Sequence, residues 1–163
     1  MLTTKFTLKS LTDHRLAFIA LAHQTCDALG KAHIELEMDA EKECSFQMEL
    51  GGISFLIVHG DTRYPGRFSI YARLGQPPAD EVRVYRRLLE INPLLLASAN
   101  ATLGMDSQSG DIVLAFQDQI GAFHGDSLLD RLDDAVDLAI RWREDGFEAA
   151  QPSPDWAAVI AMV

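Results

Sequence analysis

The sequence predicts an α+β domain in which an antiparallel, twisted sheet of about five strands packs against three helices, in the order α-β-β-β-α-β-β-α. Three observations lead to this fold class. Apolar residues recur at helical spacing in three segments, near the start, the middle and the end of the chain. Between these segments, apolar and polar residues alternate as they do in half-buried strands. Glycine-containing turns, such as Gly51-Gly52, separate neighbouring strands.

The first helix is expected from Leu8 to Leu29, with Ser10 or Thr12 as its N-cap and Gly30 as its C-terminal stop. One apolar stripe recurs at helical spacing along this segment: Leu11, Phe18, Ala22, Cys26 and Leu29. Further apolar residues widen the surface beyond the stripe: Leu16, Ile19 and Leu21. Two interpretations stay open, a helix lying deep in a groove or a helix whose additional apolar residues meet a partner.

A meander of three strands is predicted next. The segment 32–42 contains a short strand or a loop, and the first clear strand, Phe46 to Leu50, alternates apolar and polar residues. The returning strand begins at Ile53 and is apolar on both faces, which indicates a central strand or one covered on both sides. The third strand is expected from Phe68 to Leu74.

The middle helix is expected from Glu81 to Ile91, with an end or a kink at Asn92-Pro93, because proline donates no amide and disfavours a helical residue before it. A hairpin follows, with strands at 101–106 and 111–116. Five leucines in this region are our first choice for a self-association surface: Leu88, Leu89, Leu94, Leu95 and Leu96.

The last helix is expected to start at Asp126 or Ser127, where Ser127 and Asp130 have the spacing of a capping box. Its predicted buried stripe consists of Leu129, Leu132, Val136, Ala139 and Ile140. We expect residues 1–150 to form one domain and residues 151–163 to form a C-terminal tail. The apolar end of this tail, WAAVIAMV, is a frayed end, a last helical turn on the core or a contact with another chain.

The composition argues against several classes of function. A formal net charge of −10 argues against nucleic-acid binding, which requires a basic stripe. No apolar run is long enough for a membrane-spanning helix, so membrane insertion is not expected. Cys26 and Cys44 lack metal-binding or redox spacing, and together with the absence of a secretory signal they predict a reduced, cytoplasmic protein.

The sequence offers little catalytic chemistry. His59 with Asp61, and His124 with Asp126 and Ser127, are the local pairings that resemble acid–base or nucleophile arrangements. A loop leading into a capped helix explains the second pairing better. Motifs for phosphate, nucleotide or metal binding are absent, so we predict no enzyme activity, no cofactor and no metal site.

An excess of apolar residues remains to be explained. Leu56 and Val58 lie opposite the strongly apolar set of their strand, and Val113 and Ala115 do so on the last strand. With three helices to cover five strands, some of this surface is expected to stay open and to bind another polypeptide.

The stretch LLEINPLLLASANATLGMDSQSGDIVLAF, Leu88 to Phe116, carries a family resemblance. Its paired leucines, asparagine, small residues, strand, acidic glycine turn and apolar strand resemble the class I type III secretion chaperones of the Tir chaperone (CesT) family. The closing helix, SLLDRLDDAVDLAIRW, is similar to the acidic last helix of that family, and the resemblance extends from about Leu11 to Trp142.

The resemblance implies a cytoplasmic homodimer that binds the N-terminal region of a secreted effector and keeps it competent for export. It implies a dimer interface on the middle helix and the strand after it: Leu88, Leu89, Ile91, Leu94, Leu95 and Leu103. It implies effector contacts from the first helix and the sheet: Phe18, Leu21, Phe55, Ile57, Ile112 and Leu114.

Two features depart from the family pattern, the break at Asn92-Pro93 and the tail after the last helix. Three alternatives stay open at this point. The chain is a YbjN-like regulatory module of the same fold, an enzyme that uses His59 or His124, or a structural subunit that docks through its tail.

Overall fold

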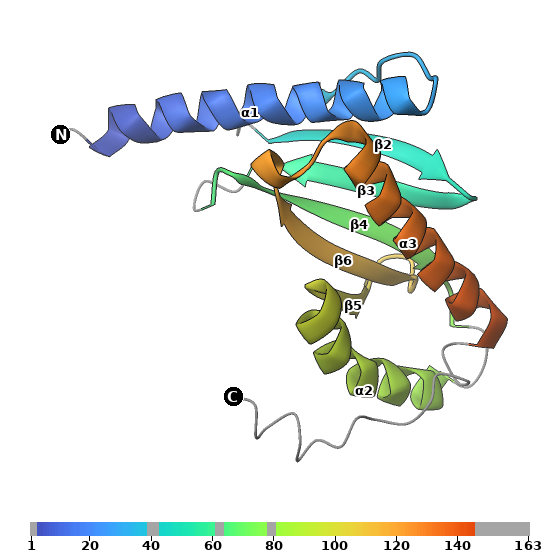
Figure 1. Cartoon of the computed structure of the whole chain (residues 1–163). Coiled ribbons are helices and arrows are strands. Elements are labelled where there is room, and N and C mark those ends of the chain that lie inside the picture. Colours follow the sequence, from blue (N-terminus) through green and yellow to red (C-terminus); the bar gives the residue numbers. More distant parts are fainter. Residues whose placement is uncertain (1–2, 39–42, 61–63, 78–80, 146–163) are drawn as a thin grey trace.

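The computed structural model describes residues 3–38, 43–60, 64–77 and 81–145, and it confirms the predicted fold class (Figure 1). A two-residue strand and a short 3-10 helix are additional to the predicted order. The elements are α1 (Thr3–Ala28), β1 (Glu37–Met38), β2 (Cys44–Leu50), β3 (Ile53–His59), β4 (Arg67–Gly75), α2 (Glu81–Ala99), β5 (Ala101–Met105), β6 (Ile112–Gln119), η1 (Ile120–Ala122) and α3 (Gly125–Asp145).

The strands form one antiparallel sheet in the order β1-β2-β3-β4-β6-β5. Strands β2, β3 and β4 form the predicted meander, whose first turn is Gly51-Gly52 with φ values of 57° and 73°. Both values require the left-handed backbone that glycine adopts most readily. Helix α2 then carries the chain beyond β6, so that β5 becomes an edge strand and β6 returns beside β4.

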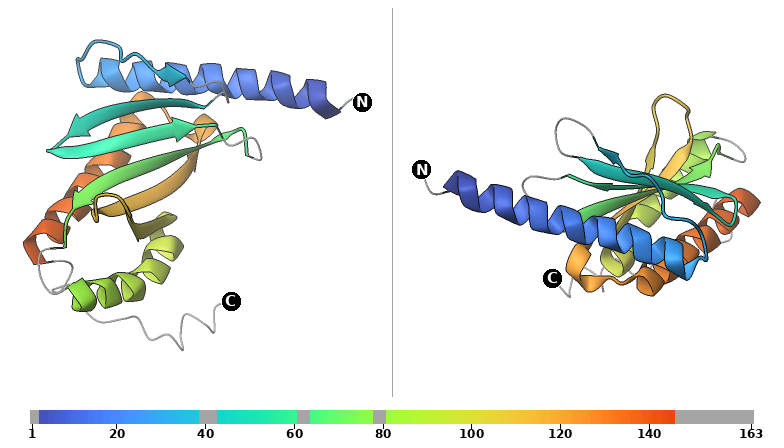
Figure 2. Two further views of the ribbon diagram at one scale, coloured as in Figure 1. Left: turned by 180° about the vertical axis from the view of Figure 1, so that it is seen from behind. Right: turned by 90° about the horizontal axis from the view of Figure 1, so that it is seen from above.

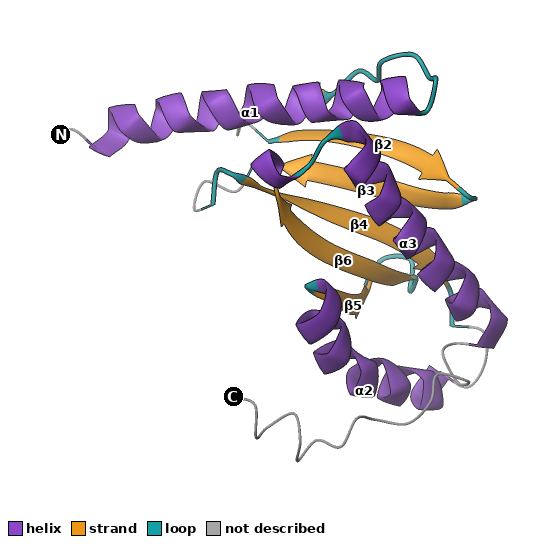
Figure 3. Ribbon diagram, viewed as in Figure 1, coloured by secondary structure: helices purple, strands orange, loops and turns teal. Residues whose placement is uncertain are grey.

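Helix α3 lies across one face of the sheet, α1 runs along its β2 end and α2 along its β5 end (Figure 3), and all three helices contribute side chains to one core. Seen from behind, the strands β2, β3, β4 and β6 lie in front of α3 with no helix across them (Figure 2, left). The residues of β3 show the consequence. Ile53, Phe55 and Ile57 face the helices and are fully buried, whereas Leu56 and Val58 face the other way and are half-buried. Strand β3 is therefore central and covered on one face.

Helix α1 begins at Thr3, earlier than predicted, so Ser10 and Thr12 lie inside the helix and do not cap it. The predicted C-terminal stop at Gly30 is confirmed. Gly30 has a φ of 62°, and the backbone N–H of Lys31 donates to the carbonyl of Cys26 at 2.9 Å. This pattern of a left-handed glycine and a bond back across the last turn ends the helix.

Of the two alternatives at Asn92-Pro93, the expected end of the helix is wrong, since α2 continues through Pro93 to Ala99. Pro93 lies on the exposed side of the helix, where water can solvate the carbonyl of Leu89 that loses its intrahelical donor. Helix α2 ends instead at Asn100, which has a φ of 50° and donates its side-chain amide to the carbonyl of Gln117 at 2.8 Å.

Helix α3 begins at Gly125, one residue before the predicted start, and Ser127 acts from inside the first turn. The Ser127 hydroxyl accepts the backbone N–H of His124 at 2.9 Å, which makes His124 the capping position. The predicted stripe is confirmed at Leu132 and Ala139, which are buried, and Leu129 and Val136 are half-buried against the core, but Ile140 is exposed. The residues of α3 that are buried are Leu128, Leu132, Ala135, Ala139 and Trp142. The expected tail, 151–163, lies outside the described residues.

Candidate protein-binding surfaces

The uncovered side of the sheet carries an apolar centre, which we call the open face. The strand register places Leu56, Tyr71 and Ala115 in one row across β3, β4 and β6. Val58 and Val113 lie on the same side, because residues two apart on a strand share a face. Tyr71 is 39% exposed, and the other four are half-buried. An apolar group of this kind on an uncovered face is typical of a binding surface.

Three shallow hollows surround Tyr71, with volumes of about 360, 200 and 300 Å³. The first lies over Leu56 and Val113 and reaches Arg73 at the end of the sheet. The second lies between the sheet and the last turn of α2, where Leu96 contributes. Several points at which side chains of a partner could insert are thus arranged around one exposed aromatic ring.

Polar groups form a rim around the apolar centre. The guanidinium of Arg73 lies 3.5 Å from the carboxylate of Asp111 and 3.9 Å from that of Asp106. The carboxylate of Asp106 accepts the backbone N–H of Gln108 at 2.9 Å and the hydroxyl of Ser109 at 3.0 Å. These hydrogen bonds lower the pKa of Asp106 and fix the β5–β6 turn. The turn projects on the open side of the sheet (Figure 2, right).

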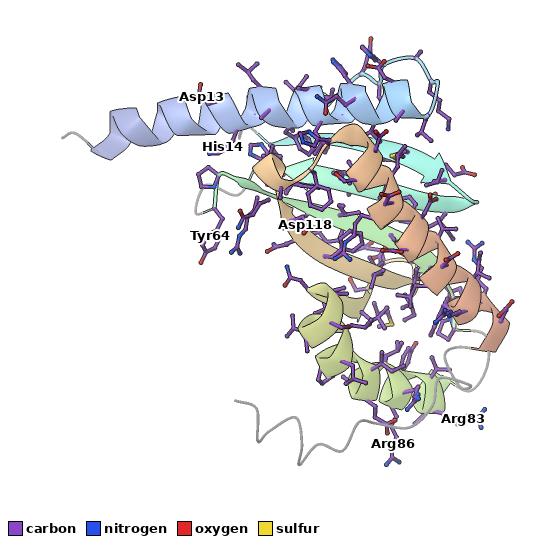
Figure 4. All side chains as sticks on the ribbon, viewed as in Figure 1. Asp13, His14, Tyr64, Arg83, Arg86 and Asp118 are labelled. Atoms are coloured by element: carbon purple, nitrogen blue, oxygen red, sulfur yellow. The ribbon has the colours of Figure 1, made fainter. Side chains whose placement is uncertain are left out.

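A second apolar surface runs along α2, and we call it the α2 stripe. Val82, Leu89 and Leu96 follow one another at seven-residue spacing and are 77%, 72% and 55% exposed. This spacing places all three side chains on one side of the helix. Arg83 and Arg86 project away from the sheet near the beginning of α2 (Figure 4). The α2 stripe adjoins the open face, because Leu96 lines one of the hollows around Tyr71.

The structure divides the six residues expected at a dimer interface. Leu89 is exposed, whereas Leu88 and Leu103 are buried between α2 and β5. Three others are half-buried, Ile91, Leu94 and Leu95, and of these Ile91 and Leu95 pack against the core. Leu88 and Leu103 therefore hold α2 on the sheet, and Leu89 belongs to the surface that remains free within the described chain.

The six residues expected to contact an effector lie in the core. Each is between 0% and 3% exposed: Phe18, Leu21, Phe55, Ile57, Ile112 and Leu114. They point from the sheet towards the helices or from α1 towards the sheet. In this arrangement they support the open face from beneath, and the side chains that reach its surface are their neighbours of opposite parity, such as Leu56 and Val113.

Arg131 on α3 joins three elements beneath the open face. It donates to the carbonyl of Ala99 at the end of α2, and its guanidinium lies 4.7 Å from the ring centroid of Phe116. Its side chain is also 3.5 Å from the carboxylate of Asp118 on β6, which lies between α3 and the sheet (Figure 4). Burial raises the pKa of Asp118, and the charge of Arg131 opposes that rise. The cluster fixes the position of α2 relative to the sheet.

The two histidines considered for catalysis both make contacts within the fold. His59 is buried against Phe18, with ring centroids 5.4 Å apart, and its Nε2 lies 2.8 Å from the carbonyl of Pro65. Burial lowers the pKa of His59. Asp61 lies outside the described residues. His124 is exposed and contacts Ser127 through its backbone N–H and carbonyl. Among the described residues, no group of three or more metal-binding side chains is present.

Sequence reasoning missed Tyr71 and Val82. A signal existed for both. Tyr71 has the same parity as Ser69 and Arg73 on its strand, and a single aromatic among polar residues on a strand face indicates a binding position. Val82 precedes Leu89 and Leu96 by seven and fourteen residues, a period that the predicted break at Pro93 concealed.

No helix within the described residues has the length and apolar character to cross a membrane. The model of the Tir chaperone protein (CesT) family matches residues 28–143 of the chain. None of the curated proteins matches the sequence.

Several solved structures resemble the fold. The ExsC–ExsE complex aligns with a TM-score of 0.60 and 15% identity, over 79% of this chain and 91% of that chain. The HopA1–SchA chaperone–effector complex aligns with a TM-score of 0.60 and 20% identity, over 80% and 95%. The Yersinia pestis type III secretion chaperone SycH, in complex with a fragment of YscM2, gives 0.51 and 18%, over 74% and 94%.

Proposed function

Because this chain belongs to the Tir chaperone protein (CesT) family, we propose that it is a cytoplasmic chaperone of type III secretion that acts on an effector. In this proposal a homodimer binds the N-terminal region of the effector and keeps it competent for export. The family match over residues 28–143 is the observation that carries the proposal. The chaperone–effector complexes among the similar structures support the same kind of client.

The α2 stripe supports self-association. Val82 and Leu96 are equidistant in sequence from Leu89, so two antiparallel copies of α2 that meet at Leu89 place Val82 opposite Leu96 of the partner subunit. A surface that matches itself in this way suits a closed twofold dimer. The expected interface is therefore centred on Leu89, with the half-buried Ile91, Leu94 and Leu95 beside it.

The open face supports client binding. An apolar centre around Tyr71 with a polar rim resembles the composition of a protein–protein interface. Client side chains would insert into the hollows, and the client backbone would meet rim groups such as Arg73 and Gln117. The six predicted contacts in the core contribute by holding the strands in position.

The test is co-purification of the tagged chain from its native host, followed by light scattering on the recovered complex. The proposal predicts a mass of two copies plus one larger protein that is bound through its N-terminal region. A dimer with no client would favour a regulatory module of the same fold. A monomer that binds no protein would contradict both parts of the proposal.

A further inference from the structure

We propose that residues 155–163 of the same chain occupy the open face around Tyr71 when no client is bound. The inference rests on the proposed function only in treating the open face as the client surface. The segment then acts as an intramolecular competitor that a client displaces.

The apolar chemistry of the segment favours this placement. After Asp155 the sequence is WAAVIAMV, which has no charged side chain. It follows the residues 28–143 that the family model matches, so it belongs to this chain and not to the shared fold. A segment with this composition is stabilised by any apolar surface within its reach, at about 25 cal/mol for each Å² that it buries.

The described chain ends close to the open face. Arg143, in the last turn of α3, donates to the carbonyl of Gly52 at 3.2 Å and to the carbonyl of Leu74 at 3.4 Å. Both partners lie at the same end of the sheet as Ser54 and Arg73, which line the 360 Å³ hollow on the open face. The chain therefore leaves α3 beside this hollow, on the other side of the sheet.

The connection after α3 is long enough for the segment to reach the open face. Residues 146–154 separate the end of α3 from the segment, and roughly nine extended residues span at most about 30–32 Å. Passing from the helix side to a position on the open side crosses two layer separations of about 10 Å each, or about 20 Å, which is within this reach. A short connection of this kind gives an effective concentration in the millimolar range, which favours the chain's own segment over a second copy.

The segment also contains a side chain that suits the hollow. The hollow is lined by Leu56, Tyr71 and Val113 and bordered by Arg73, so it suits an indole ring. Trp156 supplies that ring. Covering the apolar centre in this way keeps the client surface from associating with other apolar surfaces before a client arrives.

Tryptophan fluorescence tests the inference, because the chain has two tryptophans and Trp142 is fully buried. The difference between the full chain and its Trp156→Phe variant isolates the signal of Trp156. We expect acrylamide to quench Trp156 several-fold less than free indole. Tyr71→Glu should raise that quenching at least threefold, and Ile140→Glu, an exposed apolar position on α3, should leave it unchanged.

Three outcomes would overturn the inference. Trp156 could be quenched like free indole in the unchanged protein, its shielding could depend on protein concentration, or Leu89→Glu could release it in place of Tyr71→Glu. The last two results would assign the segment to a second copy or to the α2 stripe. If circular dichroism shows that Tyr71→Glu does not fold, Leu56→Lys replaces it.

This assay contains no client and separates the two proposals. Shielding of Trp156 that Tyr71→Glu abolishes supports the inference even if no client is ever recovered. A client that binds at the open face of a protein whose Trp156 is fully quenchable would leave the proposed function intact. It would refute the inference that residues 155–163 occupy this face.

Discussion

The two faces of the sheet are made by the same strands, yet they have different tasks. On β3, Phe55 packs against the helices and is fully buried, while its neighbour Leu56 faces the uncovered side. On β6, Leu114 and Val113 divide in the same way. The comparison teaches that a strand apolar on both faces supplies a core with one set of side chains and a binding surface with the other.

The largest expected effect separates these two sets directly. Phe55→Ala removes a ring from the covered face and should lower the free energy of unfolding by about 3–5 kcal/mol. Leu56→Ala on the open face should cost about 1 kcal/mol or less, because the side chain is only half-buried. Urea denaturation of both variants measures the difference. Equal losses of stability would show that the open face is part of the core.

The α2 stripe is expected to have the next largest effect. Leu89→Asp places a carboxylate at the centre of the proposed dimer interface and should weaken dimerisation at least a hundredfold, about 2.7 kcal/mol. Leu16→Asp changes an equally apolar, exposed leucine on α1 and is the matched control. Analytical ultracentrifugation over a range of concentrations measures both. A Leu89→Asp protein that dimerises normally would remove the α2 stripe from the interface.

The covered face contains a titratable group whose effect should be smaller. Since burial lowers the pKa of His59, the folded protein keeps it neutral at a pH where the unfolded chain binds a proton. Its stabilising contribution is complete above about pH 6.5 and is lost as the pH falls from there towards the lowered pKa, by at most about 1.4 kcal/mol per pH unit.

His59→Gln retains an N–H that can donate to Pro65 and cannot titrate in this range. We expect its unfolding free energy to vary less between pH 7 and pH 5 than that of the unchanged protein. Comparison of the two at pH 8, where neither side chain is charged, provides the reference. Identical pH dependence would show that burial of His59 does not contribute to the pH dependence of the unfolding free energy.

The sequence was sufficient for the element order, the Gly51-Gly52 turn and the expectation of an uncovered apolar surface. These features depend on local alternation and turn chemistry. It was insufficient where tertiary contacts decide the outcome. Pro93 is tolerated because it faces solvent, and the predicted stripe of α3 fails at its end because Trp142 takes a core position in place of Ile140.

The choice of site residues shows a related limit. The most apolar residues of β3 and β6 were chosen as client contacts, and the helices cover those very residues. The alternation of side chains indicates that a strand has two faces, but the whole chain decides on which face the helices pack. The less apolar set, which includes Tyr71, is the one that reaches the surface.

The most direct test of the account is calorimetric titration of the N-terminal region of a co-purified effector into three proteins: the unchanged chain, Tyr71→Asp and Ile140→Asp. Both substituted residues are exposed, one on the open face and one on the helix side. The account predicts that Tyr71→Asp weakens binding at least tenfold, about 1.4 kcal/mol, with no change in fold, and that Ile140→Asp binds normally. Equal affinity for all three proteins would show that the client does not bind at the open face.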